Sequence, residues 1–76
     1  PNSIAIAWKE KSKDAKFEIQ LSGGGGQFLT VYEGTVEATN ELENYRFKGP
    51  TASDIRIVIT SGNASISEVK IKELKS

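Results

Sequence analysis

The side chains that could do acid or base chemistry in this chain are carboxylates and amines, because its 76 residues include no histidine and no cysteine. The carboxylates that we expect near one end of the fold are Asp14, Glu33, Glu37, Glu41 and Glu43. A glycosidase would need two of them about 5 to 10 Å apart in a cleft. A chain this short can hardly form such a cleft, and it lacks a nucleophile and base pair. We therefore predict that the protein is not an enzyme.

A run of four glycines, residues 23–26, is the other feature with a possible chemistry. Glycine-rich loops cradle phosphate groups when Gly-Lys-Ser or Gly-Lys-Thr follows and a helix begins. Neither follows here, because residues 28–32 have the β-branched and aromatic side chains of a strand. The glycines instead predict a hairpin tip, where positive φ angles are tolerated.

Composition excludes several classes of partner. Ten lysines and arginines balance ten aspartates and glutamates, so no overall field attracts nucleic acid or an anionic membrane. No apolar run approaches the roughly 18 residues that a membrane span needs. Without cysteine, neither a disulfide nor a thiolate metal site can reinforce the thin core of a chain this small. Packed strands, a bound ion or a partner must therefore stabilise it.

The elements that must position these side chains are strands, because apolar residues alternate with polar ones at a period of two. We expect strands within residues 3–8, 16–21, 28–32 and 41–48, and two more in residues 52–71 around a turn at 61–64. Turn residues separate these segments and no amphipathic helix is evident, which predicts an all-β, antiparallel β-sandwich of about six strands. We expect the first two strands to form a hairpin, and residues 52–71 to be the platform on which the others pack.

Alternating strand directions sort the connections into two ends of the sandwich. Residues 9–15, 33–41 and 61–65 should lie at one end, and the glycine loop and residues 49–53 at the other. Rigid strands fix the positions of loops that are free to vary, so binding sites concentrate on such loop clusters. The first end carries more charged and polar side chains, and we expect function there.

The order of five segments carries a family resemblance: IAIAW, FEIQLS, FLTVYEG, YRFKGPTASDIRIVITSGN and ISEVKI. Together they resemble the C-terminal half of discoidin-like, F5/8 type C domains, and in particular carbohydrate-binding modules of the family 32 type. The resemblance implies a galactose-binding-like jelly roll, of which residues 1–76 would be a single domain or half-domain. Family members are nearly twice as long. The resemblance therefore implies completion by another chain or by a second copy, since an unpaired strand edge is a template for pairing.

The resemblance also implies a sugar site on two loops, the one that follows Trp8 and the turn at residues 61–63. The residues carried over are Lys9, Glu10, Lys11 and Lys13 in the first loop and Asn63 in the turn, with Trp8 as a possible aromatic platform. Trp8 has two interpretations, as a sugar platform or as a core residue, because aromatic residues at a spacing of two usually pack inward. The relatives carry an aromatic residue and an arginine in the first loop, which this sequence lacks.

Many relatives hold a structural calcium ion with a glutamate of the last strand, and Glu68 occupies that place in this sequence. Calcium requires six to eight oxygen ligands. The other ligands would come from the half that this chain does not match, so the alternative is that Glu68 is an exposed strand residue.

The sequence thus supports two hypotheses of function. The first is a non-catalytic, extracellular carbohydrate-binding module that attaches an enzyme or a cell to polysaccharide. The second is a structural or self-assembling β-sandwich fragment, natural or engineered, whose partner is a protein chain or a second copy.

Overall fold

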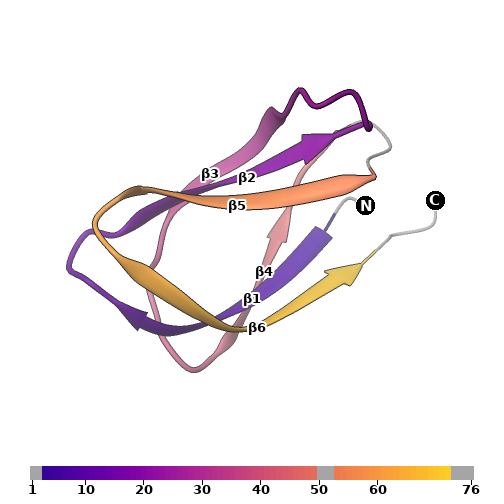
Figure 1. Cartoon of the computed structure of the whole chain (residues 1–76). Coiled ribbons are helices and arrows are strands. Elements are labelled where there is room, and N and C mark those ends of the chain that lie inside the picture. The colour runs from indigo at the N-terminus through magenta and orange to yellow at the C-terminus, as the bar shows by residue number, and fades with distance from the viewer. Residues whose placement is uncertain (1–2, 50–52, 73–76) are drawn as a thin grey trace.

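The computed structural model describes residues 3–49 and 53–72, and it contains six strands and no helix in that part of the chain (Figure 1). The strands are β1 (Ser3–Lys11), β2 (Lys16–Ser22), β3 (Leu29–Thr35), β4 (Leu42–Arg46), β5 (Asp54–Ser61) and β6 (Ala64–Lys72). All strand pairs are antiparallel. The predicted all-β, antiparallel β-sandwich of six strands is confirmed.

Two sheets of three strands face each other, in the orders β4-β1-β6 and β3-β2-β5. Figure 1 shows β1 and β2 in different sheets, each flanked by two neighbours. The predicted hairpin of the first two strands is therefore wrong. Side by side, β1 and β2 would point both apolar faces the same way, whereas in facing sheets each face covers the other. Of the consecutive strands, β2 and β3 do pair, and the glycine loop joins them as predicted.

The core lies between the two central strands. β1 contributes Ile4, Ile6 and Trp8, and β2 contributes Phe17, Ile19 and Leu21; each of these side chains is at most 1% exposed. Burying branched and aromatic side chains of this size contributes about 1.5 to 3 kcal/mol each. The expectation that residues 52–71 form the platform is wrong, because β5 and β6 are edge strands.

Aromatic side chains close the side of the sandwich that holds β3 and β4. The Phe17 ring lies 5.0 Å from the Tyr45 ring and 5.8 Å from the Tyr32 ring. The Trp8 indole contacts the edge of Phe17 at 5.1 Å and donates from Nε1 to the Tyr45 hydroxyl at 3.2 Å. In the part of the chain that the structure describes, no buried side-chain polar atom lacks a partner. The buried polar groups on this side of the core therefore have hydrogen-bond partners.

The side that holds β5 and β6 is more open. Ile4 pairs with Ile71 and Ile6 with Val69, so the apolar residues of β6 share the inner face of their sheet. Nevertheless Ile66 is 38% exposed, Val69 41% and Ile71 58%. β6 thus shows the expected alternation of apolar and polar residues. Its apolar side chains nevertheless stay partly exposed at the edge of the sheet.

Tyr45 should make the fold sensitive to alkaline pH. Burial raises the pKa of its hydroxyl above the ordinary value of 10.0, although the hydrogen bond from Trp8 acts in the opposite direction. A raised pKa in the folded state means that the unfolded chain releases this proton first. The contribution of the protonated Tyr45 hydroxyl to the unfolding free energy is therefore complete below about pH 10. It is lost as pH rises through the folded-state pKa. Urea unfolding between about pH 9 and pH 11 should show this loss, and Tyr45→Phe should make the dependence shallower. If the unfolding free energy of Tyr45→Phe falls equally steeply with pH, the pH dependence comes from groups other than Tyr45.

Within residues 3–49 and 53–72, the structure has no helix long and apolar enough to cross a membrane.

Candidate functional site

Three connections that are distant in the sequence meet at one end of the sandwich. Backbone hydrogen bonds join Ser12 N to Asn63 O at 2.8 Å, Val36 N to Ala15 O at 2.8 Å, and Asn40 N to Trp8 O at 2.7 Å. At the other end, Ser53 N donates to Ser22 O at 2.9 Å, which joins the glycine loop to the segment before β5. The predicted sorting of the loops into two ends is confirmed for the described residues, and residues 50–52 of the predicted second group lie outside them.

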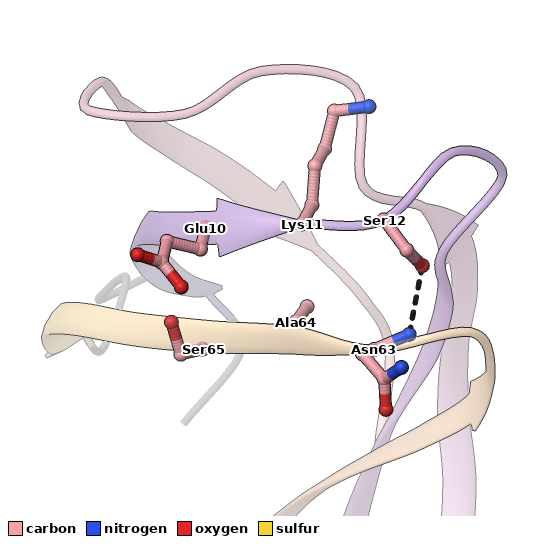
Figure 2. Close-up of a pocket in the computed structure, with 6 residues that line it drawn as sticks. All are labelled: Glu10, Lys11, Ser12, Asn63, Ala64 and Ser65. Carbon is pink, nitrogen blue, oxygen red and sulfur yellow. Dashed lines mark hydrogen bonds between the residues drawn. The ribbon is translucent and has the colours of Figure 1, made fainter.

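The turn between β5 and β6 is held against the connection between β1 and β2 by a reciprocal pair of hydrogen bonds. Ser12 N donates to Asn63 O, and Asn63 N donates to Ser12 Oγ at 2.8 Å (Figure 2). Gly62 makes the turn possible because its φ is +70°, and because an added Cβ would lie 2.5 Å from Ser12 Oγ and 3.2 Å from Ala15 Cα. Only glycine fits here without strain.

A shallow pocket of about 390 Å³ lies beside this turn. Its lining comes from the end of β1 and the start of β6, and consists of Glu10, Lys11, Ser12, Asn63, Ala64 and Ser65 (Figure 2). The β1–β6 pairing sets Glu10 opposite Ser65, and Lys11 opposite Ala64. Figure 2 shows the Glu10 and Ser65 side chains pointing toward each other, while Lys11 extends away from Asn63. We call these six residues the loop-end pocket.

The structure brings two of the predicted sugar-binding residues together and separates the others. Lys11 and Asn63 both line the loop-end pocket, although 52 positions separate them in the sequence. Lys9 and Lys13 are exposed but do not line it. Trp8 is fully buried and offers no ring face to a ligand. The sugar-platform interpretation of Trp8 is therefore wrong in this structure, and its core interpretation holds.

Sequence reasoning missed Ser12 and Ser65 as candidate site residues. Serine is common in loops, so residue type alone gave no signal. What places both in the pocket is the register of β1 against β6, which is irregular near Trp8 and includes Lys9 as an extra residue between two paired positions. Bulges of this kind change which way the following side chains point, and the sequence pattern does not reveal them.

Chemically, the loop-end pocket offers groups that exchange hydrogen bonds and charge. The Lys11 ammonium supplies up to three donors, the Glu10 carboxylate accepts only, and the Asn63 carboxamide does both. Ser12 and Ser65 add hydroxyls. The lining contains no aromatic ring. Such a set matches a small polar molecule rich in hydroxyl groups.

Glu68 does not form a calcium site with its neighbours in the described residues. Its carboxylate lies 3.9 Å from the Lys70 ammonium, and both side chains are about half exposed. No group of three acidic, histidine or cysteine residues that could hold a metal ion occurs within residues 3–49 and 53–72. Because calcium needs six to eight oxygens, these residues do not fit the ion that the family resemblance implies.

In comparisons with known proteins, no family model, no curated protein and no solved structure matches this chain. The resemblance to discoidin-like domains therefore stays a prediction from the sequence.

Proposed function

We propose that this protein is a non-catalytic carbohydrate-binding module, acting outside the cell, that holds an attached enzyme or cell surface on polysaccharide through the loop-end pocket. The observation that carries the proposal is that Lys11 and Asn63, which the sequence resemblance singled out, line one polar pocket. The pairing of Glu10 with Ser65 and of Lys11 with Ala64, together with the bonds between Ser12 and Asn63, joins the two sides of that pocket.

The pocket's chemistry suits an acidic or hydroxyl-rich sugar. Adjacent sugar hydroxyls can donate to the Glu10 carboxylate and accept from the Asn63 carboxamide. The Lys11 ammonium extends away from Asn63 (Figure 2), so it would attract the carboxylate of a uronic acid whose hydroxyl groups contact the other lining residues. A uronate should therefore bind more tightly than the corresponding neutral hexose, and the difference should depend on Lys11.

Binding of a single sugar should be weak. The pocket is shallow, its charged groups are exposed, and its lining has no ring on which a sugar could stack. Exposed charge pairs contribute about 0.2 to 1 kcal/mol each, and a dissociation constant near 1 mM corresponds to only about 4.1 kcal/mol. A millimolar affinity is consistent with attachment to a polymer that presents many copies of the same sugar.

The test is an NMR titration of the ¹⁵N-labelled chain with galactose, galacturonate and short uronate oligomers up to about 10 mM. We expect the amide signals of Lys11, Ser12 and Asn63 to shift with a millimolar dissociation constant. Lys11→Ala should weaken uronate binding by up to about fivefold, the worth of one exposed charge pair, and leave galactose binding nearly unchanged. Asn63→Ala should weaken both, because the carboxamide contacts hydroxyls.

The matched control is Lys48→Ala, which removes the same charge from the loop at the opposite end of the sandwich. Binding should be unchanged in that variant. If no sugar shifts these signals, or if Lys48→Ala weakens uronate binding as much as Lys11→Ala does, the loop-end pocket is not a sugar site.

The exposed apolar residues of β6 favour the second candidate, a β-sandwich fragment whose partner is protein. Ile66, Val69 and Ile71 face the core side of their sheet and yet stay in contact with solvent. Completion by another chain or by a second copy would cover them. This candidate uses residues of β6 that do not line the loop-end pocket, so both functions can exist in one molecule.

A further inference from the structure

β6 presents an unpaired edge with exposed apolar side chains. It is the outer strand of the sheet β4-β1-β6, so one row of its backbone donors and acceptors has no ladder partner within residues 3–49 and 53–72. Its inner-face residues Val69 and Ile71 are among the exposed large apolar side chains. From these features and the charges between them, we infer that β6 pairs antiparallel with β6 of a second copy, with Val69 on the two-fold axis.

The part of β6 that can pair is regular. Glu68, Val69, Lys70 and Ile71 follow β1 residue for residue, opposite Ala7, Ile6, Ala5 and Ile4. The irregularity lies before this run, where Ser67 is an extra residue between Glu68 and Ile66 and its hydroxyl donates to Ala7 O at 3.1 Å. A straight segment of four residues is thus available to a second strand.

The charges on this segment select one register. In an antiparallel pair, opposite residues lie on the same face of the sheet. In a symmetric pair, one residue must therefore lie opposite its own copy, and the two-fold axis passes between the two. An axis at Glu68 would set two carboxylates against each other, and an axis at Lys70 would set two ammonium groups against each other. An axis at Val69 sets Glu68 of each copy opposite Lys70 of the other. It also places the two Val69 side chains about 4.5 to 5.5 Å apart on the apolar face.

The other side of the sandwich shows why β6 is the edge that pairs. There the aromatic rings of Tyr32 and Tyr45 lie 5.0 Å apart and close the space between the sheets. On the opposite side, the inner-face isoleucines of β5 are half-buried and those of β6 are exposed. Pairing through β6 would extend the sheet across two copies and shield apolar surface that the single chain leaves exposed to solvent.

The pairing does not rest on the proposed sugar site, because the loop-end pocket uses residues before the irregularity at Ser67. In an antiparallel pair, the two pockets would lie at opposite ends of the joined strands. A dimer would carry two such pockets, so it would engage one polysaccharide chain at two weak sites and gain avidity.

Sedimentation equilibrium of the whole chain tests the inference with two charge-reversal variants. Each variant alone should dimerise poorly, and the two mixed together should dimerise well. The wild-type chain should form a dimer whose population rises with concentration. Glu68→Lys alone would set lysine opposite Lys70 twice, and Lys70→Glu alone would set glutamate opposite Glu68 twice, so each should dimerise at least about tenfold less well. An equimolar mixture of the two variants should recover a heterodimer, because every facing pair is then oppositely charged.

The mixture separates pairing from folding, because a variant that merely failed to fold would not be rescued by another variant. The matched control is Glu33→Lys, an equal change of charge on the exposed β3 edge, which should dimerise as the wild type does. A wild-type chain that stays monomeric at millimolar concentration overturns the inference. So does a dimer that neither reversal weakens, or a mixture of the two variants that stays monomeric.

Discussion

Replacing Trp8 with alanine is expected to remove a large share of the chain's stability. The indole is fully buried, contacts the Phe17 ring at 5.1 Å and donates to the Tyr45 hydroxyl. Truncating a buried tryptophan costs about 3 to 5 kcal/mol. A 76-residue domain has a total stability of roughly 4 to 11 kcal/mol at 0.05 to 0.15 kcal/mol per residue. The measurement is the shift of the urea unfolding transition to lower concentration, followed by circular dichroism.

The matched variant is Trp8→Phe, which keeps an aromatic ring in the core and removes the donor to Tyr45. It should fold and lose about 1 to 2 kcal/mol of unfolding free energy. If Trp8→Ala costs less than about 1 kcal/mol, Trp8 is not a core residue, and the description of β1 as the central strand of its sheet fails.

Gly62→Ala is the substitution that should damage the loop-end pocket most. A left-handed φ costs an alanine about 1 to 2 kcal/mol, and the new Cβ would lie 3.2 Å from the Ala15 backbone. It would also displace Ser12 Oγ, which accepts from Asn63 N. Together these effects should lower the unfolding free energy by about 2 to 4 kcal/mol and shift the amide signals of Ser12 and Asn63.

Gly25→Ala is the control for this prediction, because nothing lies within 4 Å of the position that its Cβ would take. Its stability should change by less than about 0.5 kcal/mol. The double variant Gly62→Ala/Ser12→Ala removes the contact with Ser12 Oγ but keeps the backbone strain. It should therefore recover only part of the stability that Gly62→Ala loses. Equal stabilities for Gly62→Ala and Gly25→Ala would contradict the geometry of this turn.

The alternation of apolar and polar residues was enough to predict the fold class, because a period of two reports which face of a strand is buried. It could not report which strands pair. A hairpin and a crossing between facing sheets both join consecutive antiparallel strands, and the polar segment between β1 and β2 suits either. The expected hairpin was wrong because the apolar faces of β1 and β2 cover each other across the core.

The candidate site was predicted in part for a related reason. The sorting of loops into two ends depends only on strand direction, so it placed Lys11 and Asn63 at the same end correctly. Which side chains of those loops meet depends on the β1–β6 register and its bulges. Trp8 shows the same limit of the sequence pattern. Its place beside a loop suited a sugar platform, but its side chain points to the inner face of the sheet and is buried there.

The edge of β6 could not be identified from sequence, because Val69 and Ile71 have the same alternation as the buried residues of β2. Burial depends on the facing sheet, and an edge strand is covered less than a central one. The open side of the sandwich and the charges of Glu68 and Lys70 therefore become informative only once the strand order is known.

Both the loop-end pocket and the β6 edge depend on β1 lying between β4 and β6, and cross-strand NOEs from the ¹³C,¹⁵N-labelled chain test that arrangement most directly. The structure predicts backbone contacts between Ile6 and Val69 and between Ile6 and Glu43, with no ladder of contacts between β1 and β2. A continuous β1–β2 ladder, with no contacts from β1 to β6, would contradict the arrangement and with it both proposals.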